Sequence, residues 1–183
     1  MRIVAGRLKG RAIVAPEGQG TRPTSDRARQ AIFNVLEHAA WSEPLTGARV
    51  MDLYAGSGAL GLEALSRGAA SCLFVEQDAQ ATKAIRTNIE ALGARPKCVV
   101  QQASVMGLGP AKVPHDLVLL DPPYDTGAGH VALDRLARLG WIGEATWIAL
   151  EIGAREDREL RAFEIVAERK TGKAKILLLR LAR

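Results

Sequence analysis

The sequence predicts a single α/β domain built on a doubly wound, mostly parallel sheet, and three observations carry this prediction. The length of 183 residues suits one ordinary core. Through the middle of the chain, short apolar runs alternate with segments of helical periodicity, which is typical of parallel strands joined by crossover helices. Two final strand-like runs flank a glycine-containing turn and indicate an antiparallel hairpin. We therefore expect five parallel strands and a terminal antiparallel pair, seven strands in all.

The elements are expected in the following order. Residues 2–15 alternate loosely between apolar and basic side chains, which predicts a short two-stranded ribbon. An amphipathic helix then begins at Thr24 or Ser25 and runs to about Ala40. Strands follow near residues 49–53, 72–76, 97–101, 116–120 and 146–151, helices near 58–67, 79–92 and 129–139, and the hairpin over 163–167 and 174–179. We divide the chain into an N-terminal basic β-ribbon extension, residues 1–22, and a main domain, residues 23–183.

The composition is that of an average soluble globular protein, with 48% hydrophobic and 25% charged residues. The sequence has no apolar run of transmembrane length and no secretion-type start, so we expect a cytoplasmic protein. Cys72 and Cys98 lie in or beside predicted buried strands and are interpreted as small core residues. The three histidines lack ligand spacing, and no metal site is predicted.

The net charge of +5 is concentrated at the two ends of the chain. Residues 1–30 hold seven basic and two acidic side chains, and residues 155–183 hold nine basic and five acidic ones. The middle holds nine basic and thirteen acidic side chains. If both ends lie near an active face, they supply the field that nucleic-acid binding requires. A merely solvated basic surface is the alternative, and charge alone does not separate the two.

A glycine-rich loop, residues 56–61, satisfies G-x-G-x-x-G between a predicted strand and a predicted helix. Gly56 and Gly58 let the backbone turn sharply and approach a cofactor without a Cβ collision. Glu76 lies 20 positions after Gly56, at the end of the next predicted strand, where its carboxylate can accept hydrogen bonds from ribose hydroxyls. The pattern alone fits either NAD or S-adenosylmethionine.

Asp52 favours S-adenosylmethionine over NAD. A carboxylate at this strand end would repel a pyrophosphate and attract the cationic amino group of a methionine moiety. A carboxylate that only braces the loop is the alternative for Asp52, and for Asp78 it is N-capping of the next helix. Ala103, after the third strand of the series, is small enough to leave room for adenine, and its backbone amide is a candidate donor to the ring.

The tetrapeptide Asp121-Pro122-Pro123-Tyr124 follows a buried apolar run and has the groups needed to hold a planar aromatic amine. The Asp121 carboxylate and the Pro122 carbonyl would accept the two N–H bonds of the amine, and Tyr124 would stack on the base. Such a site cannot reach a base inside a duplex, so the target must be unpaired or flipped out. A rigid turn with a bracing aspartate is the alternative. Together with the glycine loop, the motif indicates methyl transfer to a nucleobase nitrogen.

Three segments, residues 22–34, 52–68 and 121–124, resemble the RsmD family of small-subunit ribosomal RNA guanine-N2 methyltransferases, and the resemblance spans nearly the whole chain. It implies a Rossmann-like class I methyltransferase fold with S-adenosylmethionine as the methyl donor. It also implies the N2 amine of a guanine in 16S ribosomal RNA, by resemblance guanine 966, as the acceptor. The RNA partner would be presented within a 30S subunit or an assembly intermediate, and a monomer is the default state.

The expected site residues fall into three groups. The catalytic group is Asp121, Pro122, Pro123 and Tyr124. The cofactor group is Asp52, Ala55, Gly56, Ser57, Gly58, Glu76, Gln77 and Ala103, together with Thr24 from the family's Arg-Pro-Thr segment. The RNA-binding group, carried over from the family, is Arg7, Lys9, Arg11 and Arg22.

Three other functions stay open at this point. The D-P-P-Y motif also suits methylation of adenine N6 or cytosine N4 in DNA or another RNA, although a DNA enzyme usually needs a target-recognition domain. A nicotinamide-dependent oxidoreductase would bind NAD, for which Asp52 is unfavourable. A noncatalytic RNA-binding module would retain the pocket but not need the complete catalytic turn.

Overall fold

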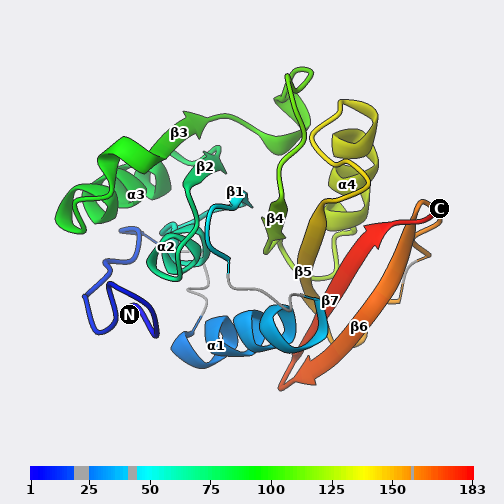
Figure 1. Cartoon of the computed structure of the whole chain (residues 1–183), viewed down its shortest axis with the longest axis horizontal. Coiled ribbons are helices and arrows are strands. Elements are labelled where there is room, and N and C mark those ends of the chain that lie inside the picture. The colour runs from blue at the N-terminus through cyan, green and yellow to red at the C-terminus, as the bar shows by residue number, and fades with distance from the viewer. Residues whose placement is uncertain (19–24, 41–44, 158) are drawn as a thin grey trace.

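The computed structural model describes residues 1–18, 25–40, 45–157 and 159–183 (Figure 1). These residues form a seven-stranded sheet with the strand order β3-β2-β1-β4-β5-β7-β6. The first five strands pair in parallel, and the last two form an antiparallel hairpin whose second strand, β7, pairs with β5. The predicted fold class is confirmed.

The element bounds follow the sequence pattern closely. The strands are β1 (Arg49–Leu53), β2 (Ser71–Glu76), β3 (Cys98–Gln102), β4 (Leu117–Leu120), β5 (Trp147–Gly153), β6 (Phe163–Thr171) and β7 (Ala174–Leu181). The helices are α1 (Asp26–Val35), α2 (Ala59–Ser66), α3 (Ala79–Ala91) and α4 (Ala128–Arg138), with short turns η1 (Leu36–Ala40), η2 (Arg95–Lys97) and η3 (Val105–Gly107). In the described ranges, no helix combines the length and the apolar character needed to cross a lipid bilayer.

The hairpin strand β6 is longer than its apolar run predicted. Its ladder with β7 slips between Ile165 and Ala167, which breaks the regular alternation of faces that marks a strand in a sequence. The residues after the slip are mostly exposed and polar, so they carry no apolar signal.

Two hydrophobic layers cover the two faces of the sheet. On one face, Leu119 of β4 belongs to a cluster with Phe33 of α1 and Leu62 of α2. On the other face, Leu120 packs in a cluster with Leu133 of α4. Because neighbouring residues of β4 enter opposite clusters, the strand is buried on both sides, as its continuous apolar run predicts. The central strand ends are thus held rigidly between helices.

Helix α1 starts at a capping serine, as predicted. The Oγ of Ser25 accepts a hydrogen bond of 3.0 Å from the amide of Ala28. The α-helix ends at Val35, and one π-helical stretch, η1, continues to Ala40, so the predicted extent is right although the last turn is wider. Thr24, the alternative cap, lies outside the described residues.

The N-terminal segment forms one antiparallel bridge, between Arg2 and Ala12, instead of a full ribbon. Its backbone groups are used elsewhere: the Arg7 amide donates to the Ser66 carbonyl at 2.8 Å, at the end of α2. Gly6 lies so close to that carbonyl that an added Cβ would stand 2.1 Å from the oxygen. The segment therefore packs onto α2, and its buried Ile3 belongs to the main core.

Candidate active site

The glycine loop and the D-P-P-Y turn meet at one edge of the sheet. The register pairs Leu53 of β1 with Val75 of β2 on one side and with Leu120 of β4 on the other. Glu76 and Asp121 are the next residues of β2 and of the chain after β4, so they flank the end of β1. The two motifs, 60 to 70 residues apart in the sequence, therefore converge at one edge of the sheet.

The loop after β1 departs from regular backbone geometry at three positions. Tyr54 has φ 55°, in the left-handed region that a side chain rarely adopts, while Gly56 and Gly58 have φ 58° and 80°. A Cβ added at Gly56 would meet no atom within 4 Å, so the space above this glycine is open. A Cβ at Gly58 would instead press on Phe74 at 3.3 Å. Gly56 thus leaves its backbone accessible, and Gly58 allows the loop to pack on β2.

Glu76 organises the loop through both carboxylate oxygens. Its Oε1 accepts from the Gly56 amide at 3.0 Å, and its Oε2 accepts from the Asp78 amide at 2.9 Å. Each oxygen retains a further lone pair for a ligand hydroxyl. Asp78 caps α3 through its Oδ2, which accepts from Ala81 at 2.9 Å, as the capping alternative predicted. The neighbouring Gln77 is exposed.

Asp52 has the arrangement of a brace, which was the alternative to direct contact with a cofactor amino group, and that contact stays a prediction. Its side chain is 1% exposed, and its Oδ2 accepts from the Gly61 amide at 2.9 Å. Burial raises the pKa of Asp52 well above its usual value, and the nearby charges of Asp121 and Glu76 raise it further, against the Gly61 hydrogen bond. The hydrogen bond to Gly61, in the first turn of α2, shows that the Oδ2 of Asp52 faces this helix.

The third glycine of the motif explains why a buried carboxylate fits there. A Cβ added at Gly61 would stand 2.5 Å from Phe74 and 2.6 Å from the Sγ of Cys72. Helix α2 therefore lies directly on β2, as the third glycine of such motifs permits. This close approach brings the Gly61 amide onto Asp52.

Asn88 of α3 ties the glycine loop to the N-terminal segment and was missed by sequence reasoning. Its Nδ2 donates to the carbonyls of Ser57 and Val14, both at 2.9 Å, and its Oδ1 accepts from the Val14 amide at 2.8 Å. Ala55, also buried, donates its amide to the Val75 carbonyl. The sequence did contain a signal for Asn88: it is a polar residue three positions after Ile85, on the otherwise apolar face of the predicted helix.

Ala103 does not offer the free amide that sequence analysis expected. Its N–H donates to the Glu76 carbonyl at 3.0 Å, which extends the pairing of β2 and β3 by one residue. The side chain is half-buried. Ala103 therefore lies beside Glu76, and its amide is already used.

The D-P-P-Y turn is anchored by a buried acid that the motif does not contain. The Tyr124 hydroxyl donates to the Oε1 of Glu151 at 2.6 Å, and Glu151 is 4% exposed in β5. The ladder pairs Leu120 with Leu150, so Asp121 and Glu151 are the next residues of neighbouring strands. A lone acid within the apolar run of residues 147–153 was the sequence signal for Glu151.

The two prolines of the turn differ in their exposure to solvent. Pro122 is buried, and Pro123 is exposed and accepts a hydrogen bond of 2.9 Å at its carbonyl from the Thr126 hydroxyl. The Asp121 side chain is half-buried. The turn thus places the Asp121 carboxylate next to the end of β1, while the Tyr124 hydroxyl reaches β5.

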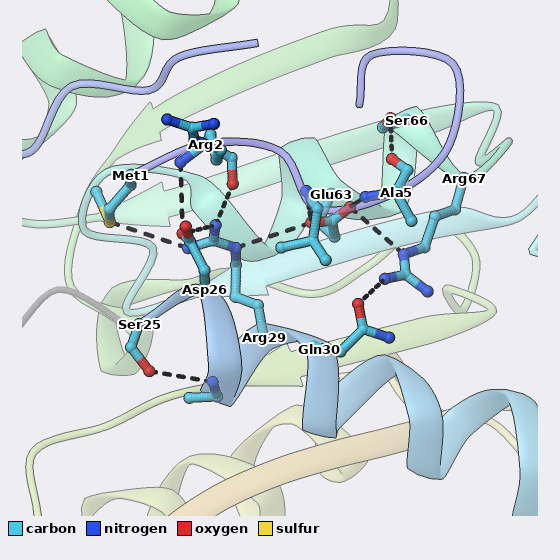
Figure 2. A network of polar contacts seen from close by, with 12 residues as sticks. Met1, Arg2, Ala5, Ser25, Asp26, Arg29, Gln30, Glu63, Ser66 and Arg67 are labelled. Atoms are coloured by element: carbon cyan, nitrogen blue, oxygen red, sulfur yellow. Dashed lines mark hydrogen bonds and ion pairs between the residues drawn. The ribbon is translucent and has the colours of Figure 1, made fainter. Parts of the chain in front are cut away.

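A buried charge network fixes α1 against α2 (Figure 2). Arg29 and Glu63 are both fully buried, with 3.9 Å between Arg29 Nε and Glu63 Oε1. Arg29 Nη2 also contacts Asp26 Oδ1 at 2.6 Å, and Arg67 Nε lies 3.4 Å from Glu63 Oε2. Figure 2 shows the side chains of Arg29 and Arg67 approaching Glu63 from two sides. This network ties the first turn of α1 to α2.

Glu63 also holds the N-terminal backbone. Its Oε1 accepts from the Val4 amide at 2.8 Å and its Oε2 from the Ala5 amide at 3.2 Å. The expected Arg-Pro-Thr contacts, Arg22 and Thr24, lie outside the described residues, immediately before this anchored helix.

The basic N-terminal side chains lie away from the D-P-P-Y turn. Helix α2 starts at the edge of the sheet that holds the glycine loop and the D-P-P-Y turn, and it runs back toward the opposite edge. The Arg7 amide is hydrogen-bonded to Ser66 in the last turn of α2, so Arg7 lies toward that opposite edge. Arg11 Nη2 donates to the Ala91 carbonyl at 2.6 Å, at the end of α3, and is engaged in helix capping. Arg7 and Lys9 are exposed. Arg7 and Arg11 are therefore held at the ends of α2 and α3, and the RNA-binding role of the segment stays a prediction.

Comparisons with known proteins place this geometry in a family. The family model described as "Conserved hypothetical protein 95" matches residues 1–180. The chain is 36% identical over 152 residues to ribosomal RNA small subunit methyltransferase D of Escherichia coli K12, covering 82% of this chain and 74% of that protein. It is 32% identical over 172 residues to the putative rRNA methyltransferase YlbH of Bacillus subtilis, covering 92% and 89%.

Solved structures agree with these sequence matches. The putative methyltransferase yhhF from Escherichia coli superposes with a TM-score of 0.83 at 30% identity, covering 99% of this chain and 97% of that one. A putative methylase from Haemophilus influenzae superposes with a TM-score of 0.79 at 27% identity, covering 100% and 98%. A ribosomal protein L11 methylase from Lactobacillus delbrueckii, at 18% identity and a TM-score of 0.69, shares the fold.

Proposed function

The chain belongs to the RsmD family, and from this premise we propose that it transfers a methyl group from S-adenosylmethionine to the N2 amine of a guanine in small-subunit ribosomal RNA. The observation that carries the proposal is the shared sheet edge, where Asp121 follows the strand beside the glycine loop. By resemblance, the acceptor is guanine 966 of 16S ribosomal RNA. The relatives named for methylation of ribosomal RNA support the reaction and the class of substrate.

The residues at this edge suit S-adenosylmethionine, which supplies an electrophilic methyl group on a sulfonium ion. The open space above Gly56 admits a ligand close to the backbone, and the Glu76 carboxylate is positioned for ribose hydroxyls. Further proposed cofactor contacts are Ala55, Ser57 and Gly58 of the loop itself, and Gln77 and Ala103 after the ends of β2 and β3. Asp52 supports the site from below by holding Gly61, and Thr24 is proposed as a contact from the segment before α1. Calorimetric titration with S-adenosylmethionine and with NAD tests this choice.

Asp121 and Pro122 would orient the acceptor amine. An exocyclic amine is a poor nucleophile because its lone pair is delocalised into the ring. The Asp121 carboxylate and the Pro122 carbonyl would accept its two N–H bonds, which favours a pyramidal nitrogen with an available lone pair. The carboxylate stabilises the positive charge that develops on nitrogen, and the proton leaves to Asp121 or to water.

Tyr124 and Pro123 would receive the base outside any duplex. The Tyr124 ring is half-buried and fixed through its hydroxyl, which suits stacking on a flipped or unpaired guanine at about 1–3 kcal/mol per base. The proposed partner is RNA within a 30S subunit or an assembly intermediate, met in the cytoplasm by a monomeric enzyme. Arg7 and Lys9 are outlying candidates for RNA contacts, and Arg22 a further one before α1.

Labelled methyl transfer tests the proposal. The protein is incubated with S-adenosylmethionine carrying a labelled methyl group and, in parallel, with naked 16S ribosomal RNA, 30S subunits lacking the modification, and duplex DNA. We expect label in RNA or subunits, recovered as N2-methylguanosine after digestion to nucleosides. Label recovered as N6-methyladenine or N4-methylcytosine would replace the guanine assignment, and label in DNA alone would overturn the RNA assignment.

A further inference from the structure

A cationic hollow lies between α1 and the turn that joins β6 to β7. Its volume is about 380 Å³. Figure 1 shows α1 passing beside the end of β6, more than 130 residues further along the chain. The side chains that characterise it are Arg27, Gln30 and Asn34 from the helix and Arg169, Lys170 and Thr171 from the hairpin. We call this hollow the hairpin groove.

The charges of the hairpin groove are available to a ligand. Arg27, Arg169 and Lys170 are exposed, and within the described part of the chain no ion pair engages any of them. Among the described residues, none that lines the groove is acidic. Arg27 and Arg169 therefore bring two positive charges to the cavity, and Lys170 adds a third at its rim, next to the turn into β7.

The acid nearest in sequence points to the other side of the sheet. Glu168 pairs across the ladder with Leu177, which belongs to the hydrophobic cluster opposite α1. There its carboxylate lies 3.9 Å from the Nζ of Lys175. Arg169 pairs instead with Ile176, which belongs to the cluster beneath α1. Since cross-strand partners share a face, Arg169 faces the groove and Glu168 does not.

The hairpin groove opens at the same edge of the sheet as the catalytic turn. Ala174 of β7 pairs with Thr171 of β6 and with Gly153, the last residue of β5. Strand β5 runs parallel to β4, so Gly153 and Asp121 lie at the same, carboxyl edge. Three spacings of about 4.8 Å separate β4 from β6, or about 14 Å, a distance that a few nucleotides of backbone can bridge.

We propose that the hairpin groove binds the phosphate backbone of the RNA strand that carries the acceptor nucleotide, which rests on the proposed function. Guanidinium and ammonium groups form charge-assisted hydrogen bonds with phosphate oxygens, and such contacts set the register of a nucleic acid without reading its sequence. The hydrogen bond of 2.7 Å from Gln30 Nε2 to Asn34 Oδ1 holds two amides on the same wall, suited to sugar and phosphate oxygens. This surface adds positive charge at the edge of the sheet that holds the D-P-P-Y turn.

Charge-neutralising variants test the groove. The triple variant Arg27→Gln, Arg169→Gln, Lys170→Gln removes three charges from it. The matched control Arg95→Gln, Lys97→Gln, Lys112→Gln removes three exposed charges before β3 and before β4, away from the active edge. The probe is a labelled single-stranded RNA taken from 16S ribosomal RNA, and its Kd is measured by fluorescence anisotropy between 50 and 200 mM salt.

We expect the triple variant to bind the RNA at least about tenfold more weakly at low salt and to lower the slope of log Kd against log salt by about 2, at ~0.7 per phosphate contact of a single strand. The control keeps the wild-type slope. With 30S subunits as substrate, the triple variant should raise KM and leave kcat and the affinity for S-adenosylmethionine unchanged.

The outcomes separate the two proposals. If the wild type transfers no methyl group to RNA or subunits, the proposed function fails. If it does, and the triple variant has the KM and salt slope of the control, only the groove proposal fails. A triple variant that keeps RNA affinity but loses binding to polyglutamate, titrated in parallel, would assign the groove to an acidic protein segment and overturn the RNA assignment.

Discussion

The hydroxyl of Tyr124 lies 2.6 Å from the Oε1 of Glu151, which joins the tyrosine of the D-P-P-Y turn to a buried acid on the neighbouring strand. A tyrosine ring that only rested on the surface would be free to rotate away from a base. Here the far end of the ring is fixed to β5, one strand from Asp121. The hydrogen bond therefore restrains the orientation of the ring that we propose as the stacking surface.

Removing this hydrogen bond should reduce turnover without removing the ring. Tyr124→Phe and Glu151→Ala should each lower kcat by up to about tenfold, since a hydrogen bond to a charged group contributes about 1.5 kcal/mol. Glu151→Gln retains an acceptor oxygen and should restore most of the activity. Steady-state methyl transfer checks this, and the double variant Tyr124→Phe, Glu151→Ala should be no slower than either single one. Additive losses would contradict the positioning role.

Asp121 should be required for transfer and dispensable for cofactor binding. Asp121→Asn removes the charge that stabilises the developing positive nitrogen, and we expect kcat to fall by at least about a hundredfold, as for loss of a major electrostatic contact. Asp125→Asn removes one charge from an exposed neighbour in the same turn and should leave kcat within about twofold. Calorimetry should find similar affinities of both variants for S-adenosylmethionine. Wild-type turnover of Asp121→Asn would refute the catalytic role.

Asp52 should act through its shape and hydrogen bond, not through its charge. Its folded pKa is raised, so the carboxylate form is penalised in the native state and the wild type loses stability as the pH rises from about 4 toward that folded pKa. Asp52→Asn keeps an acceptor for Gly61 without the charge. It should unfold at a higher temperature than the wild type at pH 8, with the difference shrinking as the pH falls, and bind S-adenosylmethionine within about threefold. A tenfold loss of affinity would restore the direct ionic contact.

The meeting of the two motifs could be predicted because parallel strands place their carboxyl ends at one edge. Apolar runs locate β1 and β4, and the residues that follow them, such as Gly56 and Asp121, must then be neighbours if the strands are adjacent. The face of the sheet toward which a side chain inside a strand points is harder to predict from the sequence. Asp52 is an acid near a strand end in the sequence, and the face of the pleat on which it lies is decided by the approach of α2, set by Gly61.

Long-range polar contacts account for most of what sequence reasoning missed. The N-terminal segment has the alternation of a ribbon. However, the amide of Val4 donates its hydrogen bond to Glu63, 59 residues later in the chain, and not to a partner strand. The hairpin groove likewise joins α1 to a turn near the other end of the chain. Local periodicity carries no information about such pairs, because neither partner changes the pattern of apolar residues around the other.

The buried pair Arg29 and Glu63 should be essential for stability. Each residue keeps another charged partner, Asp26 for Arg29 and Arg67 for Glu63, but its replacement leaves a buried charge with fewer partners, which should cost up to about 3–5 kcal/mol. We expect Glu63→Ala and Arg29→Ala each to lower the free energy of unfolding by roughly this amount in urea titrations. As a control, Glu159→Ala breaks the exposed contact with Arg161 and should cost less than about 1 kcal/mol. Equal small losses for all three variants would show that the pair is not what anchors α1.

His115 should make the fold sensitive to acid. Burial lowers the pKa of His115 from 6.5 to about 4, assisted by the positive charge of Arg49 and opposed by Asp116. Between these two values the unfolded chain binds a proton that the folded chain does not, so stability is complete above about pH 6.5 and is lost as the pH falls toward 4. The loss from this group should be roughly 1–3 kcal/mol. His115→Phe retains a ring against Trp141, whose centroid lies 5.6 Å from that of His115, and removes the titration. As the pH falls from 7 to 4.5, the wild type should therefore lose more unfolding free energy than the His115→Phe variant. If the unfolding free energies of the two proteins change in parallel with pH, His115 has the same pKa in the folded and the unfolded protein.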